Sequence, residues 1–479
     1  MQATTMKRYL AILAAVLTLC GAATAQMRTA YFMEGSYFRT DMNPALAPTR
    51  GYIALPGIGG VGLNINNNFL SVDNMLYKRN GEVVTFLNEQ VSTDDFMKKM
   101  PNVCSLGLNA DINILSFGAH TKKMFWSFGL RARSQSDASF SSNLFSTIKS
   151  LGNGRHDLSG ASINSLNYME ASLGFAIPIK EVATIGFRVK GLLGIMHAQA
   201  KLDNAFVNLD ASSITGQVRG NLRAGGMLFR SNYPTGKQEI NQILIPAFWD
   251  EMEGADALSQ ILKNIRSGGA AIDLGAEVRL FDDHLRISAA VTDLGFIYWA
   301  KNTVATGEAV ADFYYNGLNL SSGEADADGS FDTMLTNPGA KGYSTRLNCT
   351  INAGIEYNIL NNHIAFGLLS HTEFRPSTIL TELTASVNFR IGRWLTTTFS
   401  HTFLNRNRPG IFGFALNVHP AGVNLFLGAD FIGTQFAKYD TISVPQYMKS
   451  VNVYMGIGFN LGKAKYMKSM QPKEKKSKK

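Results

Sequence analysis

The sequence has few cysteines, few prolines and no long apolar run after its N-terminal region, and these shortages exclude two classes of protein. Its 479 residues include 3 cysteines and 13 prolines. Three cysteines are too few for the framework of a small disulfide-stapled secreted domain. Beyond the N-terminal region, no stretch reaches the roughly 18 consecutive apolar residues that a membrane-spanning helix requires. A helical membrane protein is therefore excluded as well.

The formal net charge of +9 is confined to the two ends of the chain. Residues 463–479 hold eight lysines and one glutamate, a net charge of +7, and Lys7 with Arg8 adds +2. The remaining body is close to neutral, so we expect no nucleic-acid partner. The Lys-rich tail is predicted to be a disordered arm in the periplasm, near anionic lipid or peptidoglycan.

The N-terminal region is typical of a secretory signal peptide, which we place at residues 1–25. Two basic residues precede an apolar segment that ends at Leu19, and the small residues up to Ala25 offer a cleavage site. Cys20 raises the alternative of a lipidated N-terminus. Leu19 disfavours it, because a lipoprotein peptidase requires a small residue at that position.

Strict alternation of apolar and polar residues from Leu347 to Ile359 predicts a two-faced β-strand. Asn361 and Asn362 predict a tight turn into a second alternating run from Ile364 to Phe374. Strands in soluble sheets usually have about five or six residues, whereas a tilted strand that crosses a bilayer needs about nine to eleven. The length of this hairpin therefore indicates a membrane-spanning barrel.

The same alternation recurs along the chain, and two independent counts agree on fourteen strands. Six tight turns, near residues 121, 181, 283, 362, 393 and 420, alternate with seven longer connections, as in outer-membrane barrels with short periplasmic turns. The predicted fold is all-β, a transmembrane antiparallel barrel of about 14 strands. Soluble sandwiches are the alternative, but they need a second sheet to cover the apolar face. The predicted strands lie near 57–66, 106–114, 126–133, 169–177, 185–193, 272–280, 285–291, 347–359, 364–374, 383–391, 395–399, 412–418, 423–431 and 451–461.

Charged residues on the inward phase of the strands are candidates for a polar conduit or a surface that binds a ligand head group. A barrel interior that holds water or a plug would show the same pattern. Because an unpaired charge inside a protein is costly, we expect these groups to pair across neighbouring strands. The lumen-facing charged candidates are Arg131, Arg188, Glu277, Arg279, Glu356 and Arg390.

The longest connection shows helical spacing of apolar residues between 246 and 265, including Phe248 and Met252. An amphipathic helix at this position would cap the barrel mouth and offer an apolar landing site to a lipid-like ligand. Packing of the helix against its own loop would produce the same spacing. The histidines show no catalytic arrangement, and the aspartates near Gly329 lack the spacing of a calcium loop. We therefore expect no enzyme activity, no cofactor and no metal.

The predicted domains are a signal peptide at 1–25, an N-terminal plug-like or hatch-like segment at 26–56, the transmembrane β-barrel at 57–462 and the Lys-rich tail at 463–479. The plug assignment follows from the lack of periodicity between the cleavage site and the first strand. The expected location is the outer membrane of a bacterial cell, where the multi-pass barrel, formed by a single chain, contacts lipid.

The run Asp41-Met42-Asn43-Pro44-Ala45-Leu46, with Leu55-Pro56-Gly57 before a glycine-rich strand, resembles the start of an uncharacterised family of exported barrels, a domain of unknown function. The whole arrangement is similar to the FadL-like long-chain fatty acid transporters. The same opening also resembles barrel proteins associated with type IX secretion.

The FadL-like resemblance implies binding or transport of a hydrophobic or amphiphilic small molecule, with the N-terminal segment as a hatch. Only Asn43, Pro44 and Ala45 match well enough to be carried over as ligand-binding or plug candidates. The Lys-rich tail and the polar inward phase depart from that family. The type IX resemblance implies instead a non-transporting component of secretion or surface assembly, with a protein of that machinery as its partner.

Overall fold

The computed structural model describes residues 28–462 apart from several gaps. The predicted signal peptide and the Lys-rich tail lie outside the described residues, as do Phe248 and Met252 of the predicted loop helix. No helix among the described residues is long and apolar enough to cross a membrane. The gaps are at 151–153, 181, 211–212, 227–228, 232–243, 247–266, 320–325, 340, 377, 393, 405–410, 433–435, 440–441 and 446–449.

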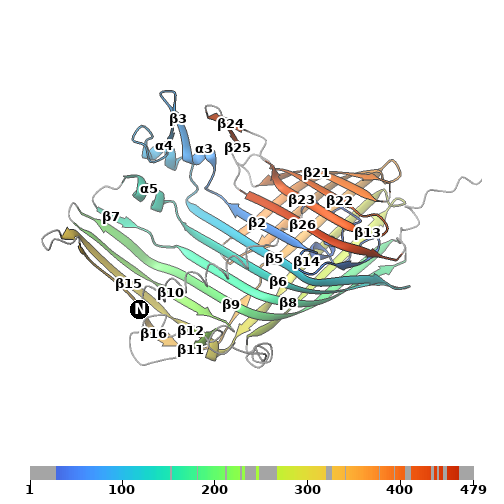
Figure 1. Ribbon diagram of the computed structural model, residues 1–479, viewed down its shortest axis with the longest axis horizontal. Coiled ribbons are helices and arrows are strands. Elements are labelled where there is room, and N and C mark those ends of the chain that lie inside the picture. Colours follow the sequence, from blue (N-terminus) through green and yellow to red (C-terminus); the bar gives the residue numbers. More distant parts are fainter. Residues whose placement is uncertain are drawn as a thin grey trace, which may run out of the picture.

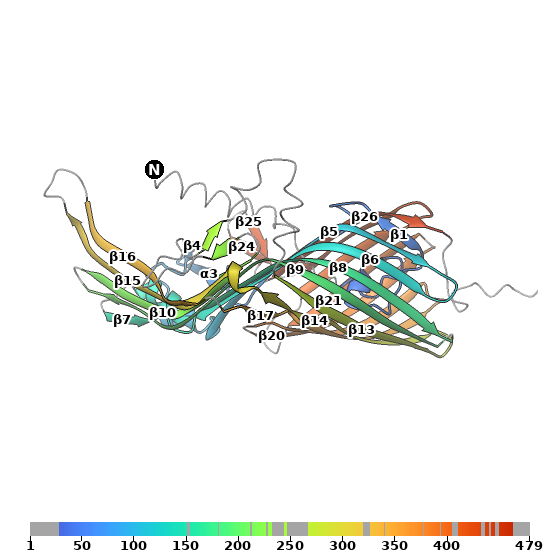
Figure 2. The ribbon, with the colours of Figure 1, turned by 90° about the horizontal axis from the view of Figure 1, so that it is seen from below.

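The described strands form a closed antiparallel barrel with fourteen positions in its wall (Figures 1 and 2). Two positions are each shared by two strands, and the last strand pairs with both strands of the first position, which closes the sheet. In order around the wall they are β1 (Gly51–Ala54) with β2 (Val61–Asn67), β5 (Val103–His120), β6 (Phe125–Ser141), β8 (Ser162–Ile179), β9 (Ala183–Leu209), β13 (Gly268–Leu280), β14 (Leu285–Trp299), β17 (Tyr343–Arg346) with β18 (Cys349–Ile359), β19 (Ile364–Phe374), β20 (Ile379–Ile391), β21 (Leu395–Leu404), β22 (Ile411–Val418), β23 (Asn424–Ile432) and β26 (Ser450–Leu461).

The prediction of a fourteen-stranded antiparallel barrel is confirmed, and the sandwich alternative is wrong. Each predicted run falls on a wall strand, and the six predicted tight turns join neighbouring strands at one end of the barrel, the turn end. Asn361 and Asn362 adopt left-handed backbone angles, with φ of 53° and 67°. Asparagine tolerates this conformation, so the pair suits the tight turn.

The wall begins at Gly51, whereas the sequence analysis places its start at residue 57. Residues 51–54 pair with β26 on one side and β5 on the other, and a break from Leu55 to Gly60 separates them from β2. The first strand is therefore interrupted rather than short, because Pro56 cannot donate a hydrogen bond to the ladder.

The outer face of the wall is apolar and the inner face is polar. Along β9, the outward side chains of Ile185 and Val189 are 49% and 48% exposed, while Arg188 and Lys190, which point inward, are each 4% exposed. Successive side chains of a strand point to opposite faces, so this division follows from the alternation in the sequence. An apolar exterior around a polar interior is typical of a membrane-spanning barrel.

Two groups of elements extend beyond the barrel at the opposite end, the loop end. One is a small cap whose apolar core contains Phe69, Tyr77, Phe96 and Cys104. No disulfide joins Cys104 to Cys349 in the described part of the chain. The cap consists of α3 (Val72–Met75), β3 (Leu76–Arg79), β4 (Glu82–Thr85), α4 (Thr93–Met97) and α5 (Asn143–Ser150).

The other group is a sheet that continues the wall outward, seen at the left of Figure 2. The second half of β9 pairs with β10 rather than β13, and β15 and β16 follow in order. The sequence analysis treats these regions as long connections, because their alternation is weaker than in the wall. The extension and the remaining short elements are β7 (Gly154–Asp157), β10 (Ile214–Gly225), η1 (Lys301–Thr303), β15 (Val304–Asn319), β16 (Asp326–Gly339), β11 (Phe229–Ser231), β12 (Leu244–Pro246), β24 (Phe436–Tyr439) and β25 (Ile442–Pro445).

Candidate functional site

Residues 28–50, here called the inner segment, lie inside the turn-end half of the barrel (Figure 2). None of these residues is exposed, and the single helical turn α2 (Arg39–Met42) is the regular element within them. The segment contacts strands on different sides of the wall. Its polar contacts include Arg28 with Glu382 at 2.5 Å, Thr29 with Ser400 at 2.5 Å, Tyr31 with Ser288 at 3.0 Å, and the Gly35 carbonyl oxygen with the Asn424 amide nitrogen at 2.8 Å.

The predicted Asn-Pro-Ala turn is part of this segment. Asn43 is fully buried, and its side-chain oxygen accepts a hydrogen bond from the backbone nitrogen of Ala45 at 2.9 Å. Its side-chain nitrogen lies 3.4 Å from the carbonyl oxygens of Ala276 and Ala289, on neighbouring wall strands. The asparagine therefore closes its own turn and also attaches the turn to the wall.

Two wall glycines make room for that turn. A Cβ atom on Gly186 would overlap the backbone at Pro44 and Ala45, and one on Gly275 would overlap the side-chain oxygen of Asn43. Glycine is required at these positions because the backbone of the turn approaches the wall so closely.

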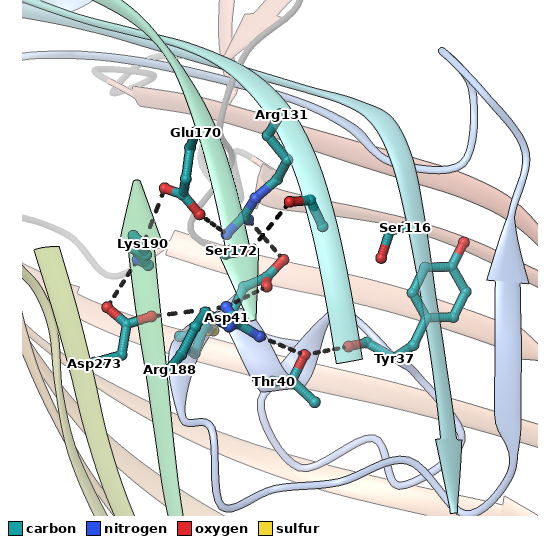
Figure 3. A network of polar contacts seen from close by, with 12 residues as sticks. Tyr37, Thr40, Asp41, Ser116, Arg131, Glu170, Ser172, Arg188, Lys190 and Asp273 are labelled. Carbon is teal, nitrogen blue, oxygen red and sulfur yellow. Dashed lines mark hydrogen bonds and ion pairs between the residues drawn. The ribbon is translucent and has the colours of Figure 1, made fainter. Parts of the chain in front are cut away.

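Asp41 links the inner segment to one side of the wall (Figure 3). Its carboxylate lies 2.9 Å from the guanidinium of Arg131 on β6 and 2.8 Å from that of Arg188 on β9. Arg188 also donates to the hydroxyl of Thr40 at 3.1 Å. Two arginines from different strands therefore meet one carboxylate of the segment.

A layer of wall charges continues from this contact toward the loop end. Arg131 lies 2.8 Å from Glu170, and Lys190 lies 2.7 Å from Asp273 and 2.6 Å from Asp293. These carboxylates and cations come from β6, β8, β9, β13 and β14. The charges of the inward phase pair across neighbouring strands, as electrostatics requires in a poorly solvated interior.

Glu34 links the inner segment to a second group of wall charges, Arg286, Arg390 and Glu356. Its carboxylate forms an ion pair with Arg286 and lies 3.6 Å from Arg390. Arg390 also pairs with Glu356 and donates to the Phe32 carbonyl oxygen at 3.1 Å. Burial by itself would raise the pKa of Glu34, but the two guanidiniums outweigh it and hold that pKa well below its usual range.

The remaining predicted charges, Glu277 and Arg279, form an ion pair with each other on β13. Arg279 also lies 3.4 Å from the hydroxyl of Thr184. All six charged candidates of the sequence analysis are thus inside the barrel.

A cavity of about 70 Å³ lies within the barrel beside α2. Phe38, Met42 and Val61 supply apolar atoms to its lining, and charged and amide side chains from several wall strands supply the rest. The polar lining residues are Asp41, Asn109, Asp111, Asn113, Arg131, Arg133, Gln135, Lys190, Thr292, Asp293, Asn348, Thr350, Asn352, His371 and Glu373.

Sequence reasoning missed Glu34 and Asp41, the residues that bring the inner segment and the wall charges together. The available signal for these ion pairs is the presence of two acidic residues in a segment without periodicity. The inward phase of the wall carries many arginines with which they could pair. It also missed His371 and the amides of the cavity. Polar inward positions are common in every strand, so no local pattern distinguishes them.

The comparisons with known proteins identify a family and several barrels of similar architecture. A family model described as "Family of unknown function (DUF5723)" matches residues 44–430. A search of curated proteins finds no match.

Solved structures with similarity to this one include toluene transporters. The Pseudomonas putida toluene transporter TodX is 8% identical, with 91% of this chain and 94% of that chain covered and a TM-score of 0.36. A TodX mutant described as a monoaromatic hydrocarbon channel is 10% identical, with 88% and 93% covered and a TM-score of 0.40. The Ralstonia pickettii toluene transporter TbuX is 9% identical, with 88% and 93% covered and a TM-score of 0.39.

Proposed function

The chain belongs to the DUF5723 family of unknown function, and we propose that it is an outer-membrane barrel that binds a small amphiphilic molecule and carries it across the membrane. The apolar outer face and the polar inner face of the closed wall support a location in a bacterial outer membrane, since that membrane is where such barrels function. The predicted signal peptide, which would direct export, agrees with it.

The cavity beside α2 is the observation that carries the proposal. Its lining combines three apolar side chains with charged and amide groups. A molecule with a polar head and an apolar part would satisfy both kinds of surface, whereas a hydrocarbon would leave the buried polar groups without partners. The proposed substrate is therefore amphiphilic.

The contacts of the inner segment support its action as a gate. Glu34 and Asp41 hold it to the wall through ion pairs. Buried ion pairs contribute little net stability compared with apolar packing, because water solvates both charges well once they separate. The ion-paired part of this contact can be separated and hydrated at a lower cost than its apolar part, in which Phe38 stacks on Phe426.

A non-transporting component of a secretion or assembly system is the second candidate. One observation favours it: residues 28–50 are buried or half-buried along their whole length among strands from several sides of the barrel. If the segment stays in place permanently, the barrel would serve as an anchor for a protein partner.

A reversible cross-link tests the gate. The hydroxyl oxygens of Thr29 and Ser400 lie 2.5 Å apart, so cysteines at both positions can form a disulfide. We expect the Thr29→Cys/Ser400→Cys variant, reconstituted in vesicles, to take up a fluorescent amphiphile only after reduction. The Thr29→Cys single variant is the matched control. Equal uptake in the oxidised and reduced states would contradict the gate, and no uptake by the unmodified protein would favour the anchor.

A further inference from the structure

Among the described residues that line the cavity beside α2, no cation is free to bind a ligand. Its cationic lining residues are Arg131, Arg133 and Lys190. Arg131 lies 2.9 Å from Asp41, and Arg133 and Lys190 lie 2.7 and 2.6 Å from Asp293. Each cation of the lining is therefore already occupied by a carboxylate of the protein.

The carboxylates of the lining outnumber these cations by one. They are Asp41, Asp111, Asp293 and Glu373, four against three. The ion-pair partners of these lining residues do not change the excess of one carboxylate, because the partners are two carboxylates and two guanidiniums. The added groups are Glu170, Asp273, Arg188 and Arg375.

Hydrogen bonding around His371 leaves an acceptor on a residue that lines the cavity. The Asn352 side-chain nitrogen donates to the Met42 carbonyl oxygen at 2.8 Å, which orients the amide. Its side-chain oxygen lies 2.6 Å from Nδ1 of His371, so that nitrogen carries the proton. Nε2 of a neutral imidazole is then a bare acceptor, and this buried atom has no partner among the described residues.

A second acceptor is unpartnered in the same lining. Asn113 is 4% exposed, and its side-chain oxygen has no hydrogen-bond partner within the described part of the chain. A buried polar atom without a partner costs free energy, so both acceptors require a donor. The cavity thus combines one excess negative charge with two groups that accept hydrogen bonds.

We propose that this cavity binds a protonated amine, the head group of the amphiphile assigned above or a free amine of the same chemistry. An ammonium supplies three N–H donors and one positive charge. It can donate to an unpartnered acceptor of the lining, and its charge balances the excess carboxylate. This inference rests on the proposed function and adds the substrate class to it.

An acid of the same length is a worse ligand. Its carboxylate would add another negative charge to a lining whose cations are occupied, and it offers no donor to the two acceptors. An alcohol supplies a single donor and leaves the charge unbalanced. The order of affinity expected is therefore amine, alcohol, acid.

Three amphiphiles with the same chain test this order: dodecylamine, dodecanol and dodecanoate. Binding to the full-length protein in a non-ionic detergent at pH 7 is measured by native mass spectrometry and by the shift of the thermal transition. We expect the amine to bind about tenfold or more tightly than the acid. Equal binding of all three, or preference for the acid, would overturn the inference and leave the proposed function standing. Binding of none would refute the proposed function itself.

Ethanolamine, which lacks the chain, distinguishes a free amine from a lipid-like one. Stabilisation by ethanolamine equal to that by dodecylamine assigns the site to free amines, and stabilisation by dodecylamine alone assigns it to amphiphiles. Both outcomes support an amine site.

The Asp111→Asn variant removes the excess charge with little change in shape. We expect it to lose the preference for the amine over the alcohol, while the matched exposed change Asp157→Asn keeps it. Asn113→Leu, which removes one acceptor, is a second variant in case the first does not fold, and it should weaken amine binding. Unchanged amine preference in a folded Asp111→Asn or Asn113→Leu protein would contradict the proposal.

Discussion

Replacing Glu34 with glutamine should release the inner segment from the wall without opening the barrel. The side chain keeps its shape and loses its charge, so Arg286 and Arg390 are left with Glu356 as their shared carboxylate. Breaking a buried ion pair by removing one partner costs about 3–5 kcal/mol. Because Glu356 still neutralises one of the two arginines, the lower end of that range applies.

Hydrogen exchange followed by mass spectrometry measures this effect. A cost of about 3 kcal/mol corresponds to roughly a hundredfold faster exchange through local opening, since about 1.4 kcal/mol is a factor of ten. The faster exchange should be confined to peptides from residues 28–50, while peptides from β19 keep their protection. Glu82→Gln, at an exposed position of the cap, is the matched control.

Two results would refute this reasoning. If protection of residues 28–50 is unchanged in Glu34→Gln, the ion pair does not hold the segment. If the wall strands lose protection to the same extent, the segment is part of the barrel's cooperative unit and cannot act as a separate gate.

Three further predictions follow from individual residues. Gly275→Ala should displace the inner segment and speed its hydrogen exchange, because the added Cβ overlaps the Asn43 oxygen; Gly422→Ala, with open space around it, should not. Burial lowers the pKa of His419 to about 4 from 6.5, so the unfolded chain binds a proton that the folded protein does not, and stability should fall as the pH drops from about 6.5 to about 4. In His419→Phe the pH dependence of the thermal transition over this window should be smaller. No disulfide joins Cys104 to Cys349 among the described residues, so the protein should migrate identically on reducing and non-reducing gels, and a disulfide between them would contradict the topology.

The candidate site was predicted in part. Asn43, Pro44 and Ala45 lie in the segment inside the barrel, and Arg131, Arg188, Glu356 and Arg390 lie on the inner face of the wall. The role of the segment as a hatch stays a prediction. The ion pairs with Glu34 and Asp41 could not be predicted, because they join residues separated by more than 80 positions in the chain.

The strands and their two faces were determined by the sequence alone. Side-chain direction in a strand alternates with every residue, so apolar and polar positions such as Val189 and Lys190 assign the outer and inner faces without knowledge of any partner. The tight turns at Asn361 and Asn362 are equally local. For these reasons the number of wall strands could be counted before any pairing was known.

The contents of the barrel were decided only by the tertiary structure. Whether Glu34 meets Arg286, and whether His371 keeps an unpartnered acceptor beside the cavity, depends on which strands face one another across the bore and on where the inner segment lies. The alternating pattern is the same for a pore filled with water and for one filled with protein. Charge pairing between the inner segment and the wall is a long-range property, and local periodicity carries no information about it.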